Sequence, residues 1–192
     1  MNLFSQAIPD TITVENTKYE INTDFRVWVE IDRLLTQSKA ITPQILAQVL
    51  ELSFKEKTLP PKLEDTLSAV ISFYGCNETT SKKASKGAKS QKRIVSFTHD
   101  SALIYAAFLS QYHIDLTCDM LHWWKFRALF DALTDEHKLS EVMKCRGTDA
   151  LKIKDKDRRA YVKRMQEQYK LPDNRSIEEI ERDNIENLAS LF

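Results

Sequence analysis

The stretch LHWWKFRALF, residues 121–130, contains two of the chain's three tryptophans and two of its nine phenylalanines. A helical step of 100° per residue places Trp123, Phe126 and Phe130 on one arc and Trp124 on the opposite arc. A helix with two apolar faces needs two sets of neighbours, so it forms the centre of a helical core or turns one face to a partner. The partner-binding candidates on this helix are Trp124 and Arg127; the alternative places both arcs in the core.

The composition predicts one mainly α-helical protein. With 192 residues the chain is long enough for one good core. Three glycines and five prolines among many Leu, Ala, Glu, Lys and Gln residues favour helix. Lys plus Arg equals Asp plus Glu at 28 each, so no global field attracts nucleic acid or an anionic membrane. We find neither a signal peptide nor a long apolar run, and we therefore expect a soluble protein.

Residue chemistry predicts no catalytic, cofactor or metal site. Three separated cysteines, Cys76, Cys118 and Cys145, suit reduced thiols rather than a disulfide framework. Cys118 and His122 have a metal-compatible spacing, but no second ligand pair accompanies them. Two basic neighbours would lower the pKa of an exposed Cys145 thiol, yet nothing marks a base near it. The isolated glycines also exclude a glycine-rich phosphate loop.

Local signals predict the order of the elements in the first half of the chain. Alternating apolar residues at 11–14 and 18–21 indicate a short hairpin. Asp24 offers a cap to a helix that carries Trp28 on its apolar face, and Thr42-Pro43 begins the next helix. A further apolar stripe follows Pro60-Pro61 and ends at Gly75. That stripe consists of Leu63, Leu67, Val70, Ile71 and Tyr74.

The second half is predicted to be helical as well. A strongly apolar helix follows Asp100 and leads into the tryptophan helix, for which Thr117 is the expected cap. A short connection predicts that these two helices pack as a hairpin. A shorter helix begins at Thr134-Asp135 and ends near Gly147, and a basic helix ends before Pro172. We therefore expect a compact helical bundle with a small N-terminal β-hairpin packed on it and a C-terminal amphipathic helix.

A lysine-rich loop interrupts this bundle at about residues 77–96. Between Thr79 and His99 there are six basic residues and no acidic one, so we interpret the segment as a flexible linker. An alternative is a nucleic-acid-binding module that uses these charges. The lack of interleaved aromatic residues for base stacking, together with the neutral total, argues against that alternative.

The last residues form a separate acidic segment. We divide the chain into a domain at 1–171 and a C-terminal helix or tail at 172–192. Ser176 and Glu179 make a capping box, and Ile177, Ile180 and Leu188 lie on one helical arc. This arc either folds back on the core or binds another chain, so these three residues join the partner-binding candidates. The tail holds six acidic and two basic residues and follows a segment, 152–170, with eight basic and three acidic residues. The two segments could therefore pair.

Several segments in fixed order resemble the siphophage proteins called phage gene product fifteen, from phages of Gram-positive bacteria. The resemblance covers residues 3–171. The lysine-rich loop replaces a shorter stretch of the family pattern, and the tail lies beyond it. The matching segments include INTDFR at 21–26, YAAF at 105–108, LHWWKF at 121–126, SEVM at 140–143 and KIKDK at 152–156.

The resemblance implies a non-enzymatic tail assembly chaperone. Such a protein binds the tape measure protein, keeps it soluble and leaves as tail tube subunits polymerise. It would act in the host cytoplasm and be absent from the mature virion. Further implied partners are a second copy of the chain and the tail tube protein; we expect no cofactor, no membrane and no nucleic acid. A virion structural or head-to-tail joining protein is the alternative.

Overall fold

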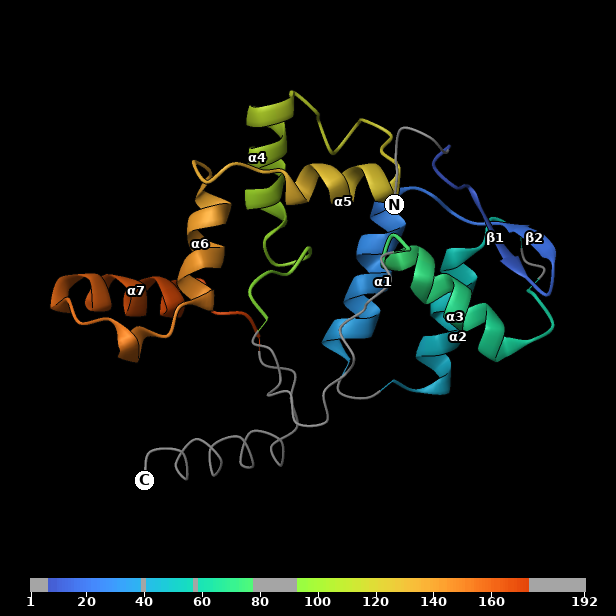
Figure 1. Ribbon diagram of the computed structural model, residues 1–192, viewed down its shortest axis with the longest axis horizontal. Coiled ribbons are helices and arrows are strands. Elements are labelled where there is room, and N and C mark those ends of the chain that lie inside the picture. Colours follow the sequence, from blue (N-terminus) through green and yellow to red (C-terminus); the bar gives the residue numbers. More distant parts are fainter. Residues whose placement is uncertain (1–6, 39–40, 57–58, 78–92, 173–192) are drawn as a thin grey trace.

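A computed structural model describes residues 7–38, 41–56, 59–77 and 93–172 (Figure 1). Most of the lysine-rich loop and nearly all of the acidic tail lie outside the described residues, so the structure does not test those two interpretations. The described chain forms two strands, seven α-helices and one short 3-10 helix. They are β1 (Thr11–Val14), β2 (Thr17–Glu20), α1 (Phe25–Gln37), α2 (Pro43–Ser53), α3 (Leu63–Tyr74), α4 (Ser101–Tyr112), α5 (Trp123–Asp131), α6 (Lys138–Gly147), η1 (Ala150–Lys152) and α7 (Lys156–Gln168).

The N-terminal hairpin is confirmed. β1 and β2 pair antiparallel through a two-residue loop, with Val14 opposite Thr17. Both loop residues, Glu15 and Asn16, have positive φ (47° and 64°), which is the geometry that matches the twist of a tight hairpin. Ile12 and Val14 point into the core. Because two strands alone are marginally stable, the hairpin depends on its packing against α3.

Side-chain caps begin most of the early helices where the sequence predicts them. The Asp24 carboxylate accepts from the N–H of Arg26 at the start of α1, and the Thr42 hydroxyl accepts from Ile45 N at the start of α2. The tryptophan helix is different. Its cap is His122, whose Nδ1 accepts from Trp124 N at 3.0 Å. Thr117 instead lies in a turn before the helix, so the expectation that it caps α5 is wrong.

Stacked aromatic rings form the centre of the core. The ring of Phe126 lies 4.8 Å from that of Phe25, 5.1 Å from Phe108 and 5.7 Å from Trp123, with each pair nearly parallel. Trp28 also stacks on Trp123, with the ring centroids 6.3 Å apart. These rings come from α1, α4 and α5, so α5 joins two halves of the molecule, as Figure 1 shows.

The helices on either side of the tryptophan stretch are not arranged as predicted. α4 and α5 are separated by the long connection 113–122, and α4 stands across α5 rather than beside it (Figure 1). The expected helix hairpin is therefore wrong, because the connection is too long to force antiparallel packing. α6, η1 and α7 form a C-terminal lobe with a second, smaller core around Val142 and Met165. The lobe packs on the rest through α4 and α6.

No helix within the described residues is both long enough and apolar enough to cross a membrane.

Candidate interaction surfaces

The two neighbouring tryptophans of α5 both bind the C-terminal end of α3. The indole Nε1 of Trp123 donates to Tyr74 O at 2.9 Å, and that of Trp124 donates to Phe73 O at 2.8 Å. Carbonyls in the last turn of a helix lack partners within the helix, and the indoles donate to two of them; Phe73 O also accepts from Cys76 N at 3.0 Å. Trp124 is only 4% exposed. The expectation that its side chain faces a partner is corrected, and both arcs of α5 belong to the core.

Arg127 also packs against the core. Its guanidinium lies over the Trp123 ring, 5.5 Å from the ring centroid, and the residue is half-buried. The Nε of Arg127 is buried and has no hydrogen-bond partner in the described part of the chain. Arg127 thus covers the Trp123 ring, and its role in partner binding stays a prediction. The other partner-binding candidates, Ile177, Ile180 and Leu188, lie outside the described residues.

Two of the residues that raised the question of metal or thiol chemistry, His122 and Cys145, lie inside the folded structure. Nδ1 of His122 caps α5 and its Nε2 donates to Pro9 O at 3.0 Å, so both ring nitrogens are occupied. Burial lowers the pKa of His122, and nearby Lys125 lowers it further. Cys145 is buried, and burial raises the pKa of its thiol, contrary to the activation that an exposed site would give. Within residues 7–172, gaps aside, no cluster of potential metal ligands occurs.

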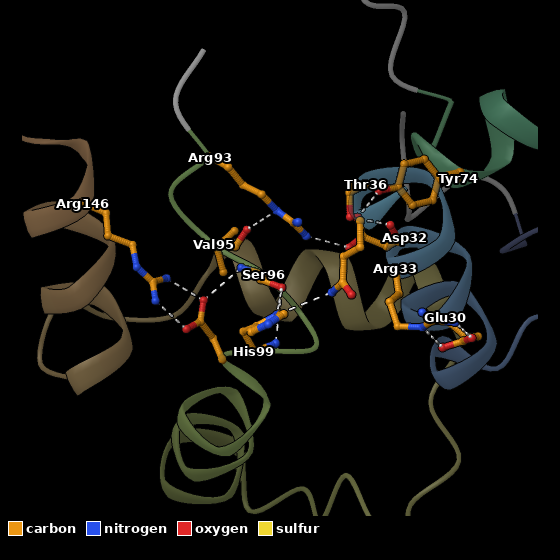
Figure 2. Close-up of polar contacts among 12 residues, drawn as sticks. Glu30, Asp32, Arg33, Thr36, Tyr74, Arg93, Val95, Ser96, His99 and Arg146 are labelled. Atoms are coloured by element: carbon orange, nitrogen blue, oxygen red, sulfur yellow. Dashed lines mark hydrogen bonds and ion pairs between the residues drawn. The ribbon is translucent and has the colours of Figure 1, made fainter. Parts of the chain in front are cut away.

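A buried ion pair holds the C-terminal lobe against α4 (Figure 2). Arg146 of α6 donates from both terminal nitrogens to the two carboxylate oxygens of Asp100, at 2.6 and 2.9 Å. The two side chains are only 6% and 4% exposed. The remaining Arg146 donor, Nε, reaches Tyr169 O at 2.7 Å, and the Asp100 carboxylate also accepts from Ser96 N. Every polar group in this pair is therefore satisfied, as a buried ion pair requires.

A second buried carboxylate, that of Asp32, binds the other end of segment 93–100. Asp32 of α1 accepts from the Tyr74 hydroxyl at 2.6 Å and from the Arg93 guanidinium at 3.3 Å (Figure 2). Burial, together with the neighbouring Asp32 carboxylate, raises the pKa of Tyr74 well above its ordinary value. Tyr74 is thus a neutral donor at physiological pH. Because Asp32 binds Arg93 and Asp100 binds Ser96 N, we assign this network to positioning residues 93–100.

One described helix, α3, has an apolar row that the other described elements cover only in part, because its middle residue, Leu67, packs against the core. Leu63, Leu67 and Ile71 follow each other at a spacing of four on α3, and we call these residues the α3 stripe. Leu63 is 55% exposed and Ile71 is 61% exposed, while Leu67 is half-buried. The adjoining side of α3 buries Val70 and Phe73. The predicted stripe of α3 is thus divided between the core and the surface.

Other large exposed apolar side chains are scattered. α3 is the only described helix that exposes two of them, and Leu59, at 45%, comes shortly before its first residue. The remaining five lie on separate segments, namely Ile41, Ile94, Leu109, Met120 and Leu151. Single exposed apolar residues are normal, whereas a spaced row on one helix marks an interaction surface.

Charge around the α3 stripe is acidic. Glu64 and Asp65 occupy the first turn of α3, where negative charge also favours the helix dipole. Asp65 pairs with Lys62 at 3.2 Å, and Lys62 also reaches Glu15 of the hairpin loop at the same distance. Glu64 lies next to Leu63 and is exposed. The surface that α3 offers is therefore an apolar row with acidic residues beside it.

Sequence reasoning missed the residues that organise these surfaces. Asp100 was recognised only as a residue before a helix, although its side chain makes no cap and binds Arg146 instead. The partners of Asp32 lie 42 and 61 residues away, so no local pattern identifies them. A single signal was available: an aspartate on the apolar face of α1 is a polar residue at a core position and needs a partner.

The family comparison covers most of the chain. The family model described as Bacteriophage Gp15 protein matches residues 4–171. The chain belongs to this family. Comparison with curated proteins and with solved structures gives no match. The Gp15 match includes β1 through α7, and hence both cores, the α3 stripe and the Arg146–Asp100 pair. Residues 172–192 lie beyond it.

Proposed function

We propose that this Gp15 protein is a tail assembly chaperone that binds the tape measure protein and keeps it soluble. The family resemblance suggests this role, and the α3 stripe is the single structural observation that supports it. It is an apolar row at the surface of a helix whose adjoining side is buried in the aromatic core. Exposed apolar residues at a spacing of four on a helix are the anchors by which helices pack against apolar surface of a partner.

The stripe suits weak and repeated contacts. Burying one Leu or Ile side chain completely contributes about 1.5 to 3 kcal/mol, and Leu63 and Ile71 are each about half exposed at 55% and 61%. One copy would therefore bind one helical segment only modestly. Many copies along a long helical partner gain avidity without any single tight contact, and each copy can still leave when a competing subunit arrives. These properties suit a factor that covers apolar surface temporarily.

The proposal includes a non-enzymatic role in the host cytoplasm. The buried polar groups of the described chain are used for positioning, because Asp32, Asp100 and Arg146 are fully engaged by neighbours. Acidic residues beside the stripe further favour a partner helix with basic flanks. Self-association and contact with the tail tube protein remain part of the proposal as secondary interactions.

Co-expression with the tape measure protein from the same phage tests the function. We expect the tape measure protein to be insoluble alone, to become soluble with this chain, and to co-elute with it in gel filtration. The measurement should be repeated at several ionic strengths, because acidic residues flank the stripe. An insoluble tape measure protein and separate elution at every ionic strength would contradict the chaperone role.

Mass spectrometry of purified virions separates the chaperone from a structural or head-to-tail joining protein. A chaperone that leaves during tube polymerisation should be present in infected cells and absent from finished particles. Detection at a stoichiometry comparable to that of other minor virion proteins would favour the structural alternative.

A further inference from the structure

Basic side chains between Lys152 and Lys170 have almost no carboxylate partners in the described part of the chain. The only ion pair among them joins Lys152 to Asp149 at a loose 3.8 Å. Elsewhere basic residues are mostly paired, as in the contacts of Arg33 with Glu30 at 2.6 Å and Lys144 with Asp135 at 2.7 Å. The C-terminal lobe therefore carries a concentration of uncompensated positive charge.

These basic residues also lie on the surface. Lys156, Arg158, Lys163 and Arg164 of α7 are exposed, as are Lys154 and Lys170 on either side of the helix. Leu151, in η1 beside them, is 75% exposed. Counting the whole segment 152–170, eight basic residues face three acidic ones. We call the exposed basic residues of this segment the basic lobe surface.

One acidic segment of the same chain begins where this surface ends. Residues 173–192 hold six acidic and two basic residues, and they follow Pro172 directly. α7 has 13 residues and is about 20 Å long, whereas 20 residues reach about 30 Å even when fully helical. The segment is therefore long enough to return along the whole of α7. A short tether also gives an effective concentration on the order of millimolar.

We propose that residues 173–192 bind in cis to the basic lobe surface and neutralise it. Charge complementarity selects this occupant, because the described lobe offers few acidic residues of its own and Asp155 is already engaged in capping α7. The contact is an electrostatic cover over an exposed face and is therefore sensitive to salt. The proposal is independent of tape measure binding, so the failure of either leaves the other standing.

Zero-length carbodiimide cross-linking of the full-length protein tests this contact. The reagent joins a carboxylate to a lysine amine only when the two are in contact, with loss of one water molecule. We expect cross-links from the acids of residues 173–192 to Lys154, Lys156, Lys163 and Lys170. The yield should fall by about tenfold in 1 M salt, where the Debye length shrinks to about 3 Å. Mixing ¹⁴N- and ¹⁵N-labelled protein should give products within one chain only.

Two double variants complete the test, and both keep the lysines of the basic lobe surface that form the cross-links. Arg158→Gln with Arg164→Gln removes two charges from the basic lobe surface, and the tail cross-links to Lys156 and Lys163 should decrease several-fold. Lys18→Gln with Lys125→Gln removes two exposed charges elsewhere and should leave them unchanged. Cross-links directed mainly to lysines 82–92, products that join ¹⁴N to ¹⁵N chains, or equal effects of the two variants would each overturn the proposal.

Discussion

Trp123 and Trp124 are neighbours in the chain, and their indole N–H groups donate to neighbouring carbonyls at the end of α3. Consecutive residues on a helix point about 100° apart, so the two rings reach the same helix end from different directions. This pair of hydrogen bonds explains why two tryptophans, each a large ring with one N–H donor, are neighbours in the sequence. Each ring fills core volume, and each N–H donates to a carbonyl in the last turn of α3, where the helix itself supplies no i+4 donor.

Substitutions of Trp124 separate the contribution of its buried ring from that of its N–H hydrogen bond. Trp124→Ala should lower the free energy of unfolding by about 3 to 5 kcal/mol, as for other large buried aromatics. Trp124→Phe keeps most of the ring but removes the hydrogen bond to Phe73 O, and it should cost about 1 kcal/mol. Urea unfolding curves of both variants check the two values. An unchanged stability for Trp124→Ala would show that its side chain is not in the core.

His122 should make stability depend on pH in a definite direction. Its Nδ1 accepts from Trp124 N, so the folded protein holds the neutral ring, and burial lowers the pKa of His122 from its ordinary 6.5. The unfolded chain then binds more protons, and stability is complete above about pH 6.5 and is lost as pH falls toward the folded pKa. Thermal unfolding between about pH 7.5 and pH 5.5 measures this loss. His122→Asn, which retains a capping oxygen, should remove most of the slope; an unchanged slope in that variant would assign it to other groups.

At the scale of elements, the Arg146–Asp100 pair decides how the C-terminal lobe sits on α4. Arg146→Met leaves the Asp100 carboxylate buried without its main partner, and it should cost about 3 to 5 kcal/mol. Adding Asp100→Leu removes the stranded charge and should restore part of that loss, so a double-mutant cycle will show strong coupling. Lys144→Met is the control, because its pair with Asp135 is exposed and worth at most about 1 kcal/mol. An Arg146→Met variant as stable as the control would contradict this role.

Elements governed by local chemistry could be predicted from the sequence, whereas those governed by distant partners could not. The hairpin, the caps of α1 and α2 and the end of α3 at Gly75 follow from residues within a few positions. The start of α5 was placed too early because a histidine provides its cap, and histidine is not a usual capping residue. The burial of Trp124 depends on α3, about 50 residues away, and no periodicity within α5 reveals which apolar face finds a neighbour.

The candidate site was predicted least well for the same reason. Leu63, Leu67 and Ile71 were recognised as apolar positions of a helix, together with Val70 and Tyr74. Only the packing of α3 against the hairpin and the tryptophans shows that one side of this set is left uncovered. Family resemblance, which the match over residues 4–171 confirms, supplied the functional hypothesis that residue chemistry alone did not.

At the scale of the whole molecule, the aromatic core fixes α3 in place, and the α3 stripe lies at the surface with acidic residues beside it. The stacked rings of α1, α4 and α5 fix the position of α3 through its C-terminal end, while the lobe of α6 and α7 is held on the far side by a buried ion pair. Figure 1 shows the two regions on opposite sides of α5. We therefore expect partner binding at α3 to be insensitive to exposed substitutions in the lobe.

The amount of soluble tape measure protein recovered with stripe variants tests this account most directly. Leu63→Asn with Ile71→Asn removes the exposed part of the α3 stripe, and Leu109→Asn with Leu151→Asn is the matched control at exposed leucines on other elements. The stripe variant should keep its melting temperature and recover at least about tenfold less soluble tape measure protein, since losing about 1.5 kcal/mol of apolar burial weakens binding by that factor. The control should behave as the wild type. Equal recovery with both variants would contradict the assignment of the α3 stripe as the partner-binding surface.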